Sequence, residues 1–143
     1  MLGESGVLAT GGFARLNSDV LKQPNSRANL PDSITPPGYY EIAAMNTGGG
    51  PARGHIIGDQ LGGPGNVKEN FVAMFQNANR KMSDYEGQIA KQLKNGKTVY
   101  YDVTPIYRDG TTYPVQMRME ARFADGSGAF ADGQGVKVID NVP

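Results

Sequence analysis

The only histidine of the chain, His55, follows an arginine in the segment Arg53-Gly54-His55. An imidazole close to a guanidinium can combine proton transfer with the binding of an anion such as phosphate. A single histidine is also typical of a surface residue or of a hydrogen-bonded core residue, and both alternatives stay open on residue type alone. With one His and no Cys, the sequence excludes a cysteine-ligated zinc site, a site with two imidazoles and a cysteine nucleophile.

Amide and carboxylate side chains follow at spacings that suit a divalent cation. Asn70 and Asn79 lie 15 and 24 positions after His55, and Glu86 lies seven positions after Asn79. Seven residues make nearly two turns of a helix, so Asn79 and Glu86 would project from one face. Facing a histidine, they would form the oxygen-rich environment that Mg²⁺ prefers. On spacing alone, an N-terminal helix cap is the favoured role for Asn79.

The hydrophobic pattern predicts the elements that would position these side chains. A helix over about residues 77–93 is predicted by apolar residues at helical spacing, Met82, Tyr85, Ile89 and Leu93. A β-hairpin over residues 98–107 and 114–123 is predicted by alternation on both sides of the turn at Arg108–Thr111. Shorter strands are predicted at residues 39–45 and 136–139, and a loop at residues 66–70. This order of elements predicts an α+β fold with an antiparallel sheet.

The first 38 residues are rich in Gly, Ser, Asn and Pro, with turn signals at 24–26 and 31–33. They predict an arm or linker that can lie over the domain, with a short helix near residues 16–22, and a domain at residues 39–143. The triplet Gly48-Gly49-Gly50 is a candidate phosphate loop. Because no Gly-Lys-Ser/Thr follows it, a flexible loop is the favoured prediction.

Charge and hydropathy restrict the class of partner. The 14 basic and 14 acidic residues give no net charge, which argues against a protein that coats nucleic acid. Residues 53–122 hold 10 basic and 7 acidic residues, a local excess of three positive charges. Arg80 and Lys81 could contact phosphates or lie on a solvated helix face. Neither a membrane-spanning run nor a signal peptide is evident, which predicts a cytosolic protein or a module of a longer exported chain.

Taken together, these residues resemble the DNA/RNA non-specific endonuclease family, whose members carry a ββα-metal, or His-Me finger, nuclease site. The similarity extends over residues 50–123 and is closest to the C-terminal nuclease modules of bacterial polymorphic toxins. The resemblance is carried by Arg53-Gly54-His55-Ile56-Ile57-Gly58, Leu61-Gly62-Gly63, Asn70-Phe71-Val72, Asn77-Ala78-Asn79 and Tyr85-Glu86. It implies a ββα-metal core with one main helix and a following β-hairpin.

The resemblance also implies a role for each matching residue. His55 matches the general base, and Asn79 matches the asparagine that binds a single divalent ion, Mg²⁺ or another such as Mn²⁺. Arg53 matches an arginine suited to binding phosphate, with Arg80 and Lys81 as further substrate contacts. Glu86 matches a catalytic carboxylate that holds a water of the metal in some members, and Asn70 matches a supporting position.

Two departures from the family pattern bear on these assignments. Ala52 stands where the family usually has Asp before Arg-Gly-His. Asn77 offers a second amide near Asn79, so the metal ligand could be shifted by two residues.

The expected function is metal-dependent, sequence-nonspecific hydrolysis of DNA, with RNA as a further candidate substrate. The chain would be the toxin module of a larger secreted or delivered bacterial protein, acting in the cytoplasm of the target cell and neutralised by an immunity protein. No membrane partner is expected. The alternative, favoured by Ala52, is a catalytically impaired nuclease-like interaction module. A phosphate-binding module at Gly48–Gly50 is a third possibility.

Overall fold

The computed structural model describes residues 9–22, 35–46, 49–63 and 70–143. Six strands and two α-helices lie in these ranges, together with short 3-10 helices at Ser18–Lys22 and Asp59–Leu61. The strands are β1 (Gly12–Leu16), β2 (Pro51–His55), β3 (Phe71–Phe75), β4 (Val99–Ile106), β5 (Gln116–Arg122) and β6 (Val136–Asp140). The helices are α1 (Tyr39–Ala44) and α2 (Gln76–Lys94).

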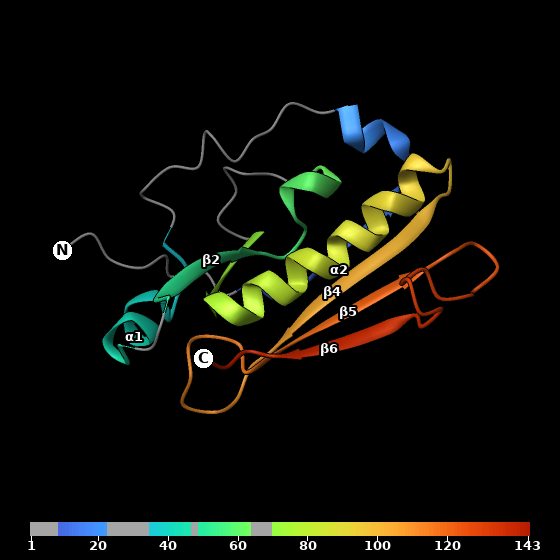
Figure 1. The fold of residues 1–143 in the computed structure, drawn as a ribbon. Coiled ribbons are helices and arrows are strands. Elements are labelled where there is room, and N and C mark those ends of the chain that lie inside the picture. Colours follow the sequence, from blue (N-terminus) through green and yellow to red (C-terminus); the bar gives the residue numbers. More distant parts are fainter. Residues whose placement is uncertain (1–8, 23–34, 47–48, 64–69) are drawn as a thin grey trace.

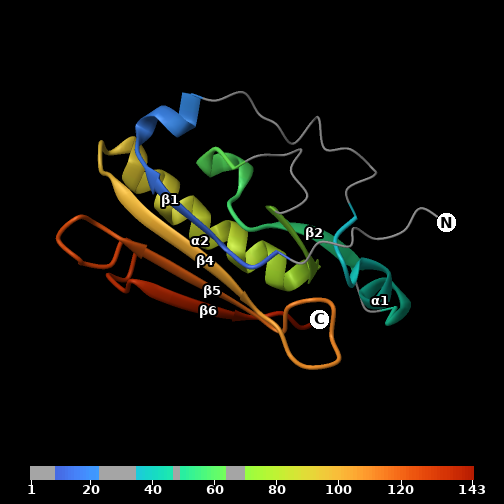
Figure 2. The same ribbon diagram turned by 180° about the vertical axis from the view of Figure 1, so that it is seen from behind.

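A four-stranded antiparallel sheet, in the order β1-β4-β5-β6, forms one layer (Figures 1 and 2). Residues of β4 and β5 alternate between buried and partly exposed, with Val103 opposite Met119 on the buried side. This alternation confirms the predicted hairpin, since one face of the sheet packs on the core. The strand predicted at residues 136–139 is also confirmed, as β6.

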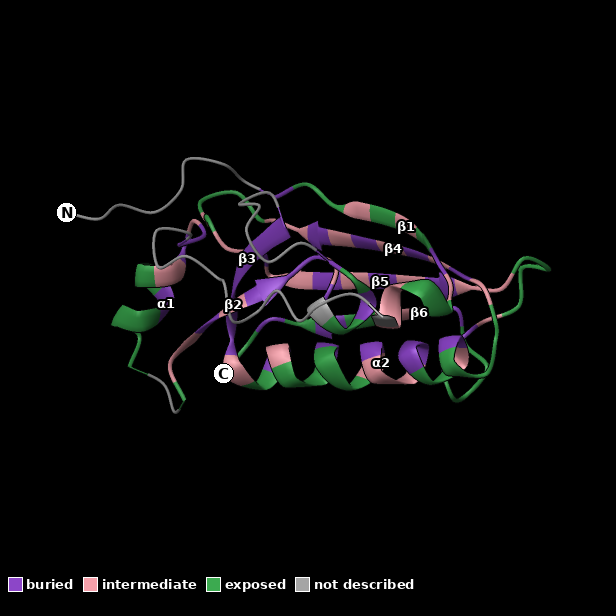
Figure 3. Ribbon diagram, turned by 90° about the horizontal axis from the view of Figure 1, so that it is seen from above, coloured by how far each residue is buried: buried purple, intermediate pink, exposed green. Residues whose placement is uncertain are grey.

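Helix α2 covers one face of this sheet and confirms the predicted long helix. Its buried stripe includes Met82, Ile89 and Leu93, which join the main core with Val99 and Tyr101 of β4. Figure 3 shows buried residues on the side of α2 toward the sheet and exposed residues on the opposite side. The helix ends at Asn95-Gly96, where Gly96 has a φ of 82°, a conformation that glycine adopts without strain.

Strands β2 and β3 form a separate antiparallel pair, and α2 follows β3 directly. In their register Pro51 is opposite Phe75 and His55 is opposite Phe71. All five residues of β3 are buried, because Ala73 and Phe75 pack with Ile42 of α1 while Val72 and Met74 join the main core. Two strands followed by a helix confirm the predicted ββα arrangement within an α+β fold.

Three local predictions differ from the structure. Residues 39–45, predicted as a strand, form helix α1, which buries Ile42 against β3; this tertiary contact overrides the β-forming composition. Gly12–Leu16, predicted as part of the arm, pairs with β4 as an edge strand. The helix predicted near residues 16–22 is a 3-10 helix at Ser18–Lys22.

Some of the predicted features lie outside the described residues. They are the turns at residues 24–26 and 31–33, residue Gly48 and the loop at residues 66–69. The division of the chain at residue 38 therefore stays a prediction. Among the described helices, none has the length and apolar character needed to span a membrane.

Candidate active site

His55 is the last residue of β2, and its ring packs against the ring of Phe71 on the neighbouring strand. The two ring centroids are 4.7 Å apart, and 8% of His55 is exposed. Arg53 lies two residues earlier on the same strand, half-buried and opposite Ala73. Alternation along a strand places residues two apart on the same side, so Arg53 and His55 share one face of β2.

The backbone just after His55 is tied to Asn70, which precedes β3. Ile56 N donates a hydrogen bond to the Asn70 carbonyl oxygen at 2.8 Å. The buried Asn70 side chain binds the next residue twice: Ile57 N donates to Asn70 Oδ1 at 2.9 Å, and Asn70 Nδ2 donates to Ile57 O at 3.0 Å. Asn70 thus holds the chain in a defined path where it leaves His55.

Glu86 of α2 holds the following residue of the same segment. Its carboxylate, with 4% of the residue exposed, accepts a hydrogen bond at Oε2 from Gly58 N at 2.8 Å. The same oxygen accepts a bond from the Tyr101 hydroxyl of β4 at 3.2 Å. A Cβ at position 58 would collide with the carboxylate, so glycine permits this close approach. Glu86 therefore joins the segment after His55 to α2 and to the main sheet.

The environment of Tyr101 agrees with this arrangement. Burial, the charge of Glu86 and the hydrogen bond to Glu86, in that order of size, raise the pKa of Tyr101 well above its ordinary value. The hydroxyl consequently keeps its proton and remains a hydrogen-bond donor to the carboxylate. Tyr101 was not predicted as a residue of the site, because in the sequence it is one of several alternating residues of the strand β4.

Asn79 lies in the first turn of α2 and is half-buried. Its Oδ1 lies 3.3 Å from the place that a Cβ would occupy on Gly54, the residue between Arg53 and His55. The absence of a side chain at Gly54 thus lets the Asn79 amide approach the strand that carries the histidine.

The course of α2 also bears on the alternatives left open by the sequence, a helix-cap role for Asn79 and a metal-ligand role for Asn77. The helix begins at Gln76 with Phe75 as N-cap, so the prediction that Asn79 could be the helix cap is wrong. Asn77 is exposed, as expected for a residue about 200° around the helix from Asn79. Arg80 and Lys81 are exposed as well, which agrees equally with a phosphate contact and with a solvated helix face.

One buried polar residue, at the other end of the β2–β3 pair from His55, was missed by the sequence patterns. Asn141 follows β6 and accepts a hydrogen bond from Phe75 N at 2.9 Å through Oδ1. Its Nδ2 donates to Ala73 O at 3.1 Å and to Pro114 O at 2.7 Å. It fixes the junction of β3 and α2, and its only signal in the sequence is its position after the last predicted strand.

The donor set near β2 fits a hard divalent cation. Among the described residues, no group of three or more His, Cys, Asp or Glu side chains could hold a metal ion. The amide oxygen of Asn79 is a hard ligand, and Mg²⁺ in proteins often keeps several waters and binds few protein oxygens together with substrate phosphate. A cation at this place would therefore be held by Asn79, water and the substrate.

Comparison with known proteins gives the fold and the family. The structure resembles magnesium-bound NucA from Streptococcus agalactiae, with a TM-score of 0.74 and 23% identity over 95% of this chain and 68% of that chain. It also resembles the Sda1 nuclease with bound zinc, with a TM-score of 0.72 and 17% identity over 94% of this chain and 71% of that one. A protein described as an extracellular endonuclease has a TM-score of 0.63 and 18% identity, over 95% and 73% of the two chains.

A search of curated proteins gave no match. At these identities the structural neighbours show a shared ββα-metal nuclease fold. The sequence profile described as DNA/RNA non-specific endonuclease matches residues 14–125, which is most of the chain and includes the last three residues of β1. This chain therefore belongs to the DNA/RNA non-specific endonuclease family.

Proposed function

We propose that this nuclease cleaves phosphodiester bonds of DNA, and also of RNA, without sequence selection and with one divalent cation, Mg²⁺ or an ion such as Mn²⁺. The observation that carries the proposal is that β2 holds Arg53 and His55 on one face, while the Asn79 amide oxygen of α2 lies against the intervening Gly54 from the other face of the same strand. The ions bound to the NucA and Sda1 neighbours support the use of a divalent cation. When bound, such an ion would stabilise the negative charge that develops on the phosphate and on the leaving oxygen.

His55 would take a proton from the attacking water. An imidazole suits this task at neutral pH because its ordinary pKa lies close to neutrality. Arg53, on the same face of β2, would bind a phosphate oxygen and keep the scissile group next to His55. Because contacts to phosphate carry no sequence information, these residues would cleave without selecting bases.

Asn70 and Glu86 would position the base rather than touch the substrate. Their hydrogen bonds hold residues 56–58, directly after His55, against β3 and α2. Small displacements of a catalytic group are costly, because about 1 Å can reduce the rate a hundredfold. The role that the family resemblance implies for Glu86, holding a water of the metal, is a separate proposal that the same variants test.

The alternative of an impaired interaction module depends on Ala52. This residue is 7% exposed and lies opposite Met74, whose side chain belongs to the main core. An aspartate here would place a carboxylate at a buried position, and a buried charge without partners is strongly unfavourable. Alanine suits the packing at this place, while His55 and Asn79 are retained. We therefore favour an active nuclease.

The decisive experiment compares plasmid cleavage by the wild type and by His55→Ala, each with Mg²⁺ and with EDTA. We expect cleavage by the wild type that EDTA abolishes, and a loss of about 10²–10⁴-fold in His55→Ala, the usual contribution of general-base catalysis. Circular dichroism controls for folding. Wild-type rates in a folded His55→Ala protein would contradict the assignment, and an inert wild type with either Mg²⁺ or Mn²⁺ would favour the interaction module.

We also propose that the chain is the toxin module of a secreted or delivered bacterial protein, neutralised by an immunity protein. The family resemblance supports this proposal, and the exposed Arg80 and Lys81 would suit an acidic inhibitor that competes with phosphate. Expression of the wild type and of His55→Ala in a growing bacterium tests this proposal. We expect the wild type to arrest growth, His55→Ala to be harmless and the product of a neighbouring gene to restore growth. Harmless expression of an active enzyme would contradict the toxin role.

A further inference from the structure

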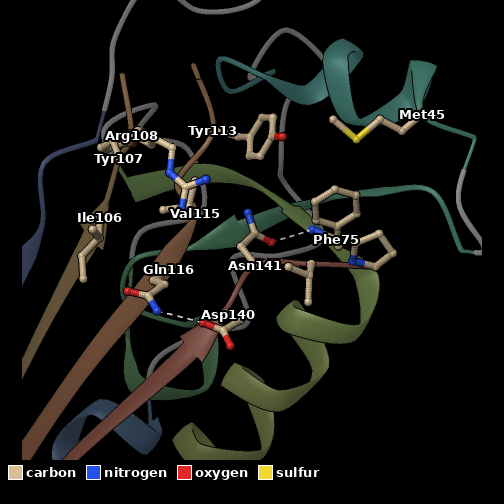
Figure 4. A pocket seen from close by; sticks show the side chains of 12 residues that line it. Met45, Phe75, Ile106, Tyr107, Arg108, Tyr113, Val115, Gln116, Asp140 and Asn141 are labelled. Carbon is tan, nitrogen blue, oxygen red and sulfur yellow. Dashed lines mark hydrogen bonds between the residues drawn. The ribbon is translucent and has the colours of Figure 1, made fainter. Parts of the chain in front are cut away.

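A second recess lies at the other end of the β2–β3 pair from His55. It is a cavity of about 640 Å³ between the end of α1, the start of α2 and the loop that joins β4 to β5 (Figure 4). Phe75, which lines it, is opposite Pro51 in the register. Pro51 is four residues before His55 on β2, or roughly 13 Å at about 3.3 Å per residue. The cavity is thus within reach of nucleotides that flank a phosphate bound at His55.

Aromatic and sulfur-containing side chains form two walls of the cavity. Phe75 and Tyr113 meet edge to face, with ring centroids 6.0 Å apart and planes at 87°. Met45 lies across the cavity from Tyr113 and is 44% exposed (Figure 4). Tyr113 is half-buried, so part of its ring remains accessible. Such walls suit a flat, partly apolar ring, as found in a nucleobase.

The cavity has a positively charged side chain, Arg108, on one side and a negatively charged one, Asp140, on the other. Arg108 is exposed, and its guanidinium forms no ion pair with any residue in the described ranges; Figure 4 shows it beside Tyr113. Across the cavity Asp140 accepts a hydrogen bond from Gln116 Nε2 at 2.8 Å. A phosphate would be attracted to the Arg108 rim and repelled from Asp140, which gives a bound nucleotide one orientation.

From these features we infer that the cavity binds one unpaired base of the substrate strand, with that nucleotide's phosphate at Arg108. The inference rests on the proposed nuclease function and adds a substrate preference to it. A base in a duplex is stacked and paired, and it would have to leave the helix to enter the cavity. The site therefore favours single-stranded over double-stranded nucleic acid.

The test uses Tyr113→Ala and Arg108→Ala, with Tyr113→Phe and Arg15→Ala as matched controls. Tyr113→Phe keeps the ring. Arg15 is an exposed arginine opposite Tyr100, at the far end of β4 from the cavity. Each variant is assayed for cleavage of a single-stranded oligonucleotide, of the same sequence as a duplex, and of bis(p-nitrophenyl) phosphate, which has no flanking base. Fluorescence polarisation in the His55→Ala background measures binding of the single strand without cleavage.

We expect Tyr113→Ala to weaken single-strand binding and raise its KM about tenfold or more, with a smaller effect on the duplex and none on bis(p-nitrophenyl) phosphate. Arg108→Ala should weaken binding and reduce its salt dependence by about one phosphate contact. Since Arg108 is exposed, this variant keeps the test valid if Tyr113→Ala does not fold. Unchanged single-strand affinity in both variants, beside an active wild type, would overturn the inference. A wild type that hydrolyses none of the three substrates would refute the nuclease function, while the polarisation assay would still test the cavity.

Discussion

Replacement of Glu86 tests whether this buried carboxylate supports the segment after His55. Glu86→Ala would leave two buried donors, Gly58 N and the Tyr101 hydroxyl, without their acceptor. A hydrogen bond to a charged group contributes about 1.5–3 kcal/mol, so the two bonds predict a loss of roughly 3–6 kcal/mol in the free energy of unfolding. Glu86→Gln keeps an acceptor oxygen and should lose only about 2 kcal/mol.

A double-mutant cycle with Tyr101→Phe isolates one of these bonds. In the wild type, Tyr101→Phe removes the donor of a 3.2 Å bond and should cost about 1.5–3 kcal/mol. In the Glu86→Ala background it removes a hydroxyl that already lacks its acceptor, so most of that cost should disappear. Urea unfolding followed by circular dichroism gives the four free energies. Additivity within about 0.5 kcal/mol would refute the coupling.

The functional readout of the same variants separates the two proposed roles of Glu86. If the carboxylate acts by positioning, Glu86→Gln should keep most of the plasmid cleavage and its dependence on Mg²⁺ concentration, because Gln can still accept the bond from Gly58 N. A selective rise in the Mg²⁺ requirement of a stably folded Glu86→Gln protein would instead indicate that the carboxylate holds a water of the metal.

Two further predictions follow from the packing around two glycines and from the raised pKa values of two tyrosines. Gly54→Ala should reduce Mg²⁺-dependent cleavage about tenfold or more, since its Cβ would collide with the Met74 side chain, stand 3.3 Å from Asn79 Oδ1 and so displace β2 and α2 from each other. Gly87→Ala, with open space around it, should leave cleavage unchanged and stabilise α2 by up to about 1 kcal/mol. Equal effects of the two variants on cleavage would contradict this account. Burial raises the pKa of Tyr107 to about 12 and that of Tyr101 well above its ordinary value. The stability that these two groups contribute is therefore present below about pH 10 and is lost as the pH rises through their raised pKa values. An absorbance titration in which all seven tyrosines of the native protein ionise together near pH 10 would be the contrary result.

Elements with a regular hydrophobic pattern could be predicted from the sequence. Helix α2 and strands β4, β5 and β6 repeat apolar residues at intervals of 3.6 or two because each presents one face to the same core. Strand β3 shows no alternation, since all five of its residues are buried between α1 and the main core. The six residues of α1 are too few for a helical period to stand out, and their burial depends on a strand about 30 positions later.

In the candidate site, too, the residues related by local sequence could be predicted and the contacts between distant elements could not. Residue type and spacing drew attention to His55, Asn79 and Glu86, because helix geometry relates the last two, and the family resemblance supplied their expected roles. The partners of Glu86 could not be predicted, since Tyr101 reaches it from another element and Gly58 through a backbone amide. Asn141 is 66 positions from Phe75, to which it is hydrogen-bonded, and no local pattern relates them. Contacts that depend on the packing of distant elements require the structure.

The Mg²⁺ dependence of plasmid cleavage in Asn79→Ala and Asn77→Ala tests the central assignment most directly. The two asparagines are two residues apart on one helix, but Asn79 lies beside Gly54 while Asn77 is exposed. The proposed site predicts that Asn79→Ala loses cleavage by about 100-fold or more at any Mg²⁺ concentration, and that Asn77→Ala stays within about twofold of the wild type. Loss of cleavage in Asn77→Ala with activity retained in Asn79→Ala would contradict the metal assignment, and so would wild-type cleavage that persists in EDTA.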